Sequence, residues 1–405
     1  MIRKSLKLKG NDDNSIFDSK WNCFLFPFLS LLFCYIFFIL KKGKPDPNGY
    51  YLIHYLYNYD HGYVPRGLLG EVLSWFFDTI SNELISDVSN LFSVLLVLAS
   101  SALCGIALYK AKGDAFKQKV VLTVMFVVCI MPTTFSVYFE TINLDKVLWL
   151  LSVVAVCLSG SSFGIWLVPA LCVIATMVNP MYLFGSMILV AIILLQKFYD
   201  SGCSLKNGLI CFVSYVPMLL LGIYAPISEK KLGFNSPQEI VDFYFSRYSD
   251  TISENTYNGF LTEWLFDYFQ PIDESIKSAF NLYFIGWNNG QKFFVYLIFV
   301  ALPCYLLLSV IWINAIKNEK KYFQKFIYFL CFISPVVLIP PVIVSWELPR
   351  YFSDNFVTQL CLVAFFTLNR NSSVSDSVKK LMTFFKSNQF FLMVTVFYFI
   401  MLTVR

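Results

Sequence analysis

Residues 22–40 read NCFLFPFLSLLFCYIFFIL, an apolar run without a charged side chain. A helix of this length extends about 28 Å, close to the about 30 Å of hydrocarbon in a bilayer. A barrel strand would show alternating apolar and polar residues, and this run does not. No A-x-A cleavage site follows the run, and a polar segment of about twenty residues precedes it, so a cleaved signal peptide is not expected. The stretch therefore predicts a retained membrane-spanning helix.

Runs of the same kind recur along the chain. The 405 residues are 57% hydrophobic and 14% charged, which is typical of polytopic membrane proteins. We expect spans near residues 22–40, 91–109, 120–137, 147–159, 163–178, 181–196, 208–226, 293–314, 326–344, 356–368 and 388–403. The sequence thus predicts an all-α polytopic membrane protein with about eleven transmembrane helices.

The basic residues indicate the orientation. With the N-terminus in the cytoplasm, basic segments at 3–9, 110–119, 197–206, 317–325 and 370–386 all face inward, as the positive-inside rule requires. The outer side then holds the loops 41–90, 138–146, 227–292 and 345–355. We divide the chain into an N-terminal membrane module (1–226), a long outer loop (227–292) and a C-terminal membrane module (293–405). Residues 370–380 are expected to form a solvated loop.

The first outer loop concentrates the polar chemistry. Asp46, Tyr50, His54 and Tyr57 follow helical spacing, so a short helix beginning near Pro47 would align them. Residues 64–78 predict a second helix that lies in the membrane interface. A purely structural belt of interfacial aromatic residues explains the same pattern.

The other outer loops add acids, arginines and aromatic residues. Glu140 and Asp145 lie at the mouth of the fourth span, either as harmless interfacial charges or as members of a site. Glu347, Arg350 and Asp354 share the segment before the tenth span, where a salt-bridged loop is the structural alternative. In the long loop, Tyr248, Trp264 and Tyr268 could contact sugar rings, although an ordinary interfacial cap has the same composition.

These residues resemble a known family. Asp46, Tyr50 and the segment from Asp60 through His61 to Arg66 (DHGYVPR) look like the first outer loop of polyprenyl-phosphate-sugar-dependent glycosyltransferases of the GT-C fold. Relatives include protein O-mannosyltransferases, the aminoarabinose transferase and O-antigen serotype-converting glucosyltransferases. The segment NLDKVLWLL, with Asp145, resembles the second signature of the family, in which an Asp after a short loop opens a span. The family often has Glu after the first Asp, where this chain has Pro47.

The resemblance implies an inverting GT-C-type hexosyltransferase with Asp46 as general base. Its partners would be a polyprenyl-phosphate-sugar donor, a glycan acceptor such as O-antigen of lipopolysaccharide, and membrane lipid. The residues themselves offer Arg66, Arg350 and Lys44 as cations for the donor phosphate. The candidate site residues are Asp46, Asp145 and Glu140 for catalysis, Arg66, Arg350 and Lys44 for phosphate, and Tyr50, His54, Asp60, His61, Glu347 and Trp264 for substrate.

Several alternatives stay open. Glu140 and Asp145 could hold acceptor hydroxyls, orient Arg66, or hold a divalent cation (Mg²⁺ or Mn²⁺). An O-antigen polymerase of similar size would also act on lipid-linked glycan at the outer face. A non-enzymatic flippase or transporter predicts charges buried within spans, which are almost free of them here. We expect no nucleic-acid partner, and we expect residence in a bacterial inner membrane with the active face in the periplasm.

Overall fold

A computed structural model gives the fold, and it describes residues 17, 19–42, 49–130, 143–228, 232–252, 254–264, 273–274, 277, 281, 297–339, 348–369, 371–390 and 393. Regular structure in these residues is helical, without a β-strand. The longer helices are α1 (Lys20–Lys42), α4 (Asn82–Lys110), α5 (Ala115–Ile130), α7 (Asp145–Ser159), α9 (Met187–Asp200), α10 (Leu205–Ser228), α15 (Leu302–Asn318), α18 (Leu348–Leu368) and α19 (Ser372–Ser387). The shorter ones are α2 (Gly49–Leu56), α3 (Leu68–Ser74), η3 (Gly164–Leu167), α8 (Val168–Val178), η4 (Pro180–Phe184), α11 (Pro237–Phe245), α12 (Glu254–Trp264), η8 (Leu297–Ala301), α16 (Tyr322–Ile333) and η9 (Ser334–Leu338). The all-α class is confirmed.

Four helical segments of the described residues are long and apolar enough to cross a membrane. They are Lys20–Phe37, Asn82–Lys110, Leu205–Ala225 and Leu297–Asn318. Each coincides with one of the predicted spans, which indicates a membrane protein. The count of eleven is not confirmed by the described residues.

The other predicted spans differ from these four in length or polarity. Helix α7 has 15 residues and α16 has 12, fewer than the roughly 20 that a straight crossing needs. Helix α5 is described over 16 residues, as far as Ile130, where the described range ends. Helix α18 has 21 residues, but polar side chains are buried along its first half: Ser353, Asp354, Asn355, Thr358 and Gln359. Most of the predicted last span, 388–403, lies outside the described residues.

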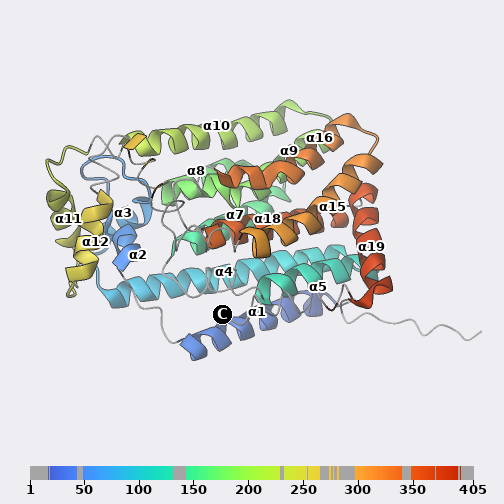
Figure 1. Cartoon of the computed structure of the whole chain (residues 1–405), viewed down its shortest axis with the longest axis horizontal. Helices are drawn as coiled ribbons and strands as arrows, with labels where there is room; N and C mark the ends of the chain where they lie inside the picture. The colour runs from blue at the N-terminus through green and yellow to red at the C-terminus, as the bar shows by residue number, and fades with distance from the viewer. Residues whose placement is uncertain are drawn as a thin grey trace, which may run out of the picture.

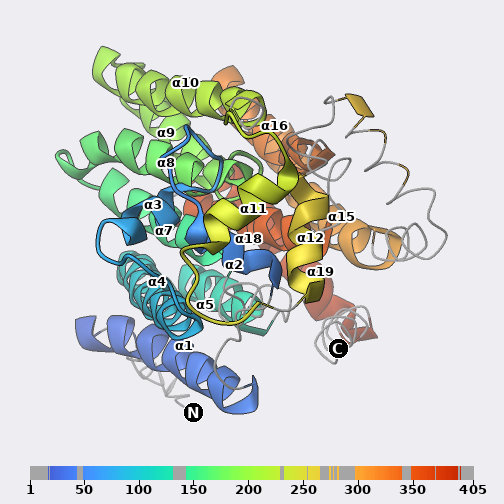
Figure 2. The same cartoon turned by 90° about the vertical axis from the view of Figure 1, so that its left-hand side faces the viewer.

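The helices form a bundle with two distinct ends (Figure 1). Helices α2, α3, α11 and α12 gather at one end, shown facing the reader in Figure 2, and α19 lies across the other end. We call these the α2 end and the α19 end. At the α2 end, the Arg247 guanidinium donates to the Leu56 carbonyl over 2.9 Å, and a β-bridge joins Ile80 to Tyr248. The loop at 227–292 is therefore tied to the first outer loop.

The core crosses the boundary between the two membrane modules. One cluster of buried apolar side chains joins Trp149 and Ile193 to Trp312, Tyr328 and Phe366. The first two residues belong to the N-terminal module and the other three to the C-terminal one. Helices α7 and α18 lie in the middle of the bundle in both views (Figures 1 and 2). The two modules thus share one hydrophobic core.

The first outer loop forms two short helices, α2 and α3, in the segments where its pattern predicts them. Helix α2 is buried along its described side chains from Leu52 to Leu56, because it packs against α3, α11 and α12. The described side chains of α2 therefore face other helices of the protein. Helix α3 is half-buried, and the aromatic side chains of Trp75 and Phe76 that follow it are exposed. A Cβ on Gly70 would meet the Tyr57 carbonyl oxygen at 2.1 Å, so glycine permits this close approach of α3 to the end of α2.

The expectation of a loop at residues 370–380 is wrong. Helix α19 begins there, with the Asn371 side chain accepting a hydrogen bond from the Val374 backbone. Asparagine at this N-cap position satisfies a backbone donor that the helix itself cannot. Val374 and Val378 are buried, so packing stabilises a segment whose polar composition alone is typical of a loop.

Candidate functional site

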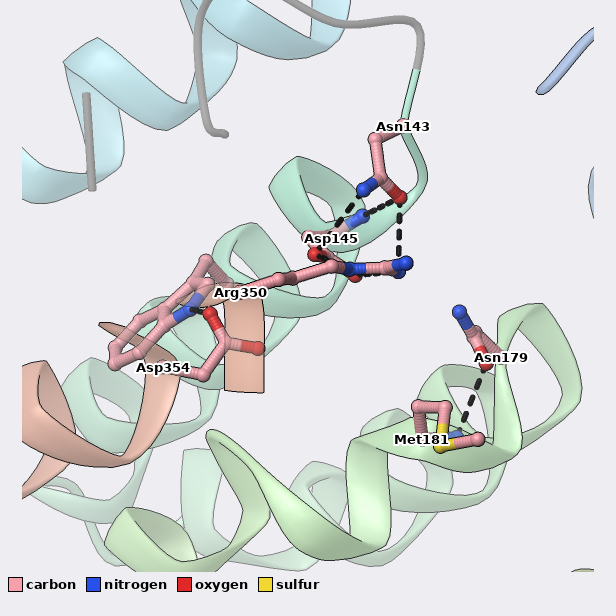
Figure 3. A network of polar contacts seen from close by, with 7 residues as sticks. Asn143, Asp145, Asn179, Met181, Arg350 and Asp354 are labelled. Atoms are coloured by element: carbon pink, nitrogen blue, oxygen red, sulfur yellow. Dashed lines mark hydrogen bonds and ion pairs between the residues drawn. The ribbon is translucent and has the colours of Figure 1, made fainter. Parts of the chain in front are cut away.

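The candidate site lies at the α2 end of the bundle. Four segments contribute described side chains: α2, the turn before α3 that holds Arg66, the start of α7, and the first turns of α18. Helices α7 and α18 both begin at this end, so residues about 200 positions apart in the sequence meet there (Figure 3).

A paired carboxylate and guanidinium form the centre of the site. Arg350 Nη2 donates to Asp145 Oδ1 over 2.5 Å, and Arg350 Nε donates to Asp145 Oδ2. The same Nη2 donates to Asn143 Oδ1 over 3.0 Å. The exposed fractions are 11% for the Arg350 side chain and 2% for that of Asp145. A two-pronged pair this well shielded from water holds the guanidinium in one orientation.

The helix dipoles of α7 and α18 act differently on Asp145 and Arg350. Asp145 is the first residue of α7, where the positive end of the helix dipole favours a carboxylate. Arg350 is in the first turn of α18, where the same dipole disfavours a cation. The carboxylate of Asp145 offsets this cost.

A second contact repeats the first one helical turn further along. Trp149 Nε1 donates to Asp354 Oδ1 over 3.0 Å, and both side chains are buried (Figure 3). Trp149 follows Asp145 by four residues, and Asp354 follows Arg350 by four. Each pair of residues therefore lies on one helix face, and the two contacts hold α7 and α18 in register. Gly185 allows the chain to pass close by, since a Cβ there would lie 3.1 Å from Asp354 Oδ2.

A second arginine meets a buried histidine beside this pair. Arg66 Nη1 lies 3.2 Å from Nε2 of His54 on α2. A guanidinium has no acceptor, so Nε2 of His54 accepts the hydrogen bond and the ring is neutral. Burial, then the charge of Arg66, then the charge of Arg350 hold the pKa of His54 well below its usual value. Two arginines from distant segments thus act on one imidazole.

The backbone at Arg66 is unusual. Its φ is +69°, a left-handed conformation that residues with side chains seldom adopt. Pro65 precedes it and Gly67 follows it, and the Gly67 N–H donates to the Val64 carbonyl over 3.0 Å. The turn aims the Arg66 side chain toward α2, and such local strain occurs most often at functional sites.

Lysine 146 anchors the start of α7 on its other side. Its Nζ donates to Ser89 Oγ over 2.7 Å and to Ser93 Oγ over 3.1 Å, both on α4. The side chain is buried. Asp145 and Lys146 therefore point to different neighbours and fix the first turn of α7 between α18 and α4.

Several predicted site residues lie elsewhere or are not described. Asp46, Lys44, Glu140 and Glu347 fall outside the described residues. Tyr50 is the second residue of α2 and Trp264 the last of α12, but the structure describes only their backbones.

The turn at 58–62 lies apart from the arginine pair in its described contacts. Asp60 is exposed and accepts from Asn58 Nδ2 over 2.5 Å. The His61 ring lies 4.5 Å from the rings of Phe234 and Phe243, counted between centroids. His61 therefore packs against the loop at 227–292, whereas His54 is the histidine beside the arginines.

Sequence reasoning missed three side chains of the site, Asn143, Lys146 and Trp149, and it did not pair Asp354 with Trp149. A shared spacing could have suggested that last pair. Asp145 and Trp149, and likewise Arg350 and Asp354, are four residues apart at helix starts on the same predicted side. Ser89 and Ser93 show the same spacing and mark the α4 face that receives Lys146.

The Asp145 carboxylate is engaged by Arg350. Both of its oxygens accept hydrogen bonds from the guanidinium. In the described part of the chain, no group of three or more His, Cys, Asp or Glu side chains could hold a metal ion.

Comparison of the chain with known protein families, with characterised proteins and with solved structures found no match. The arrangement of the site is therefore the basis for the functional conclusion.

Proposed function

We propose that the chain is an integral membrane glycosyltransferase that moves a sugar from a polyprenyl-phosphate donor to a glycan acceptor. One observation carries this proposal. Arg66 and Arg350 come from segments far apart in the chain; Arg66 donates to His54, and the charge of Arg350 helps to lower the pKa of the same imidazole, at the end of the bundle formed by the predicted outer loops. Two guanidinium groups at one place are suited to a phosphate.

The neutral state of His54 supports the same function. A protonated imidazole would repel both arginines, whereas the neutral ring accepts a hydrogen bond from Arg66 and leaves its positive charge in place. The charge of Arg350 is offset by Asp145. We assign Asp145 a positioning role, since it holds Arg350 by two hydrogen bonds. Arg66 is the second cation that we assign to the donor phosphate.

The proposed reaction is a one-step inversion. An acceptor hydroxyl attacks the anomeric carbon, the new carbon–oxygen bond forms, and the bond between that carbon and the phosphate oxygen breaks. The hydroxyl proton goes to the base, and polyprenyl phosphate leaves with its charge stabilised by the arginines. The base is Asp46, assigned by the resemblance of its segment to GT-C transferases and lying outside the described residues.

The finer features belong to the same proposal. They are a GT-C fold with about eleven spans, an active face in the periplasm of a bacterial inner membrane, and an O-antigen acceptor. The apolar helices support a location in a membrane, and the grouping of the first outer loop with the loop at 227–292 at one end supports one active face. The GT-C fold, the bacterial inner membrane and the O-antigen acceptor rest on the resemblance alone.

An O-antigen polymerase is the second candidate. The observation that favours it is the supply of arginines by two separate outer segments, because such polymerases usually depend on arginines in outer loops. The glycan of cells with and without the protein separates the two. One added side-branch sugar identifies the transferase, and loss of chain length identifies the polymerase.

The central test replaces the base. Asp46→Asn keeps the shape of the side chain and removes its basicity, so transfer of sugar from a polyprenyl-phosphate donor in membranes should fall at least about 100-fold. Asp78→Asn is the matched control, an exposed acid of the same loop, and should leave transfer unchanged. Full transfer by the inserted Asp46→Asn protein would refute the mechanism.

A second variant tests the phosphate role. Arg66→Ala should raise the apparent KM for the donor, and Arg66→Lys should restore part of it, since lysine keeps the charge and loses the two-pronged geometry. An unchanged KM in Arg66→Ala would exclude Arg66 from donor binding.

A further inference from the structure

A cavity with an apolar lining lies inside the bundle, apart from the arginine site. Its volume is about 590 Å³, and α4, α5, α7, α9 and α18 form its walls together with α1. Its lining includes the side chains of Leu103, Val128, Val156, Ile193 and Phe365. A volume of this size is in the range of known small-molecule sites, about 300–1,000 Å³.

The cavity runs along α7 toward the α19 end of the bundle. Trp149 lines it near the arginine site, and Gly160 lines it beyond the end of α7. These residues are about 16 Å apart along the helix axis. The far end of the cavity is polar. The charged and polar residues that line it there include Lys110, Lys197, Asp200 and Asn369, at the ends of α4, α9 and α18.

Two cations share this polar end. Lys110 is the last residue of α4, and Lys197 lies in the last turn of α9, where its Nζ donates to the Ser159 carbonyl. Burial and, less strongly, the charge of Lys110 lower the pKa of Lys197, whereas Asp200 raises it. Within the described ranges, no ion pair joins either lysine to a carboxylate. The Asp200 carboxylate accepts a hydrogen bond from Gln196 over 2.8 Å.

The two halves of the cavity define the occupant. The apolar half offers water too few partners, and an empty space forfeits the dispersion contacts of its walls. An acyl chain from the surrounding bilayer supplies those contacts. The pair of lysines attracts a negatively charged headgroup, as basic residues near a membrane surface do.

We propose that this cavity binds an anionic phospholipid, with an acyl chain between α4, α7 and α18 and the phosphate on Lys110 and Lys197. This site is at the opposite end of the bundle from the arginines, and it does not depend on the proposed transfer of a sugar.

Photo-crosslinking of the full-length protein in phosphatidylcholine nanodiscs tests the site. The discs contain a small fraction of lipid with a diazirine on the acyl chain, either phosphatidylglycerol or phosphatidylcholine, and mass spectrometry maps the labelled residues. Phosphatidylglycerol should label Val156, Cys361 and Phe365 roughly 30-fold more than phosphatidylcholine, as expected for two lysine contacts. Equal labelling by the two lipids would overturn the proposal.

Charge variants sharpen the experiment. Lys110→Gln combined with Lys197→Gln should reduce phosphatidylglycerol labelling to the phosphatidylcholine level. Lys206→Gln is the matched control at the same end, because Lys206 lies over the Trp166 ring, 5.5 Å from its centroid, outside the cavity lining. Unchanged labelling in the double variant would contradict the role of the lysines.

A filling variant covers the case in which the double variant does not fold. Ala364→Trp places a large side chain into the cavity and should abolish labelling there while both lysines remain. Labelling that persists would show that the chain lies elsewhere. Displacement of the phosphatidylglycerol probe by an equal amount of undecaprenyl phosphate would assign the cavity to an isoprenoid and overturn the phospholipid.

Discussion

The ion pairs at the two ends of the bundle differ in how far they are exposed to solvent. At the α2 end, Asp145 and Arg350 form a pair whose side chains are 2% and 11% exposed. At the α19 end, Asp376 and Lys379 are 58% and 56% exposed and 3.9 Å apart. A solvated pair of this kind contributes little to stability, whereas breaking a buried pair is costly. The pair at the α2 end thus fixes the orientation of the Arg350 guanidinium, whereas the pair at the α19 end contributes charge to the surface.

This difference bears on function. A buried ion pair is weak evidence for stability, because apolar residues of the same volume often serve as well. The buried pair of Asp145 with Arg350 and the buried contact of Asp354 with Trp149 both lie where the predicted outer loops meet. That concentration is consistent with a site that requires oriented charges.

Asp145→Ala is expected to give the largest effect. The variant leaves the Arg350 guanidinium buried without its carboxylate, so the free energy of unfolding should fall by about 3–5 kcal/mol. Thermal unfolding of the purified protein in detergent measures it.

The α19 end provides the matched control. Asp376→Ala breaks the pair of Asp376 with Lys379, whose side chains are 58% and 56% exposed, and should cost less than about 1 kcal/mol. Equal losses in the two variants would remove the distinction between the ends.

Trp149→Phe should have an intermediate effect. The ring keeps its bulk but loses the N–H that donates to Asp354, so stability should fall by about 1–3 kcal/mol. Trp75→Phe is the control, because its indole donates to Glu71 at an exposed position, and it should change stability by less than about 0.5 kcal/mol. Similar values for both tryptophans would show that burial does not strengthen this contact.

His54→Gln should change how stability depends on pH. The pKa of His54 is lowered in the folded protein, so below about pH 6.5 the unfolded chain takes up a proton that the folded one does not. Stability is therefore present above this pH and is lost as the pH falls, by at most about 1.4 kcal/mol per pH unit. Gln accepts from Arg66 without titrating, and its unfolding temperature should fall less on acidification.

His61→Gln is the comparison for that experiment, because His61 is an exposed histidine of the same loop. Its profile should follow that of the wild type. A wild-type protein whose unfolding temperature does not depend on pH in this range would contradict the buried neutral state of His54.

Part of the fold could be read from local sequence. The four long apolar helices follow from runs such as 22–40, because the length of such a run and the absence of charge are local properties. The loop expected at 370–380 failed for the opposite reason. Its polar composition is typical of a loop, but the segment begins helix α19. Asn371 caps this helix, and Val374 and Val378 pack into the core.

The candidate site shows the same division. The sequence by itself determined that the chain is helical and apolar, and that acids and arginines cluster between its apolar runs. Only the tertiary structure decided that Asp145 binds Arg350, 205 positions away, and that His54 rather than His61 lies beside the arginines. The physical reason is that a buried charge must find a partner in space, and the packing of α7 against α18 decides which one is within reach.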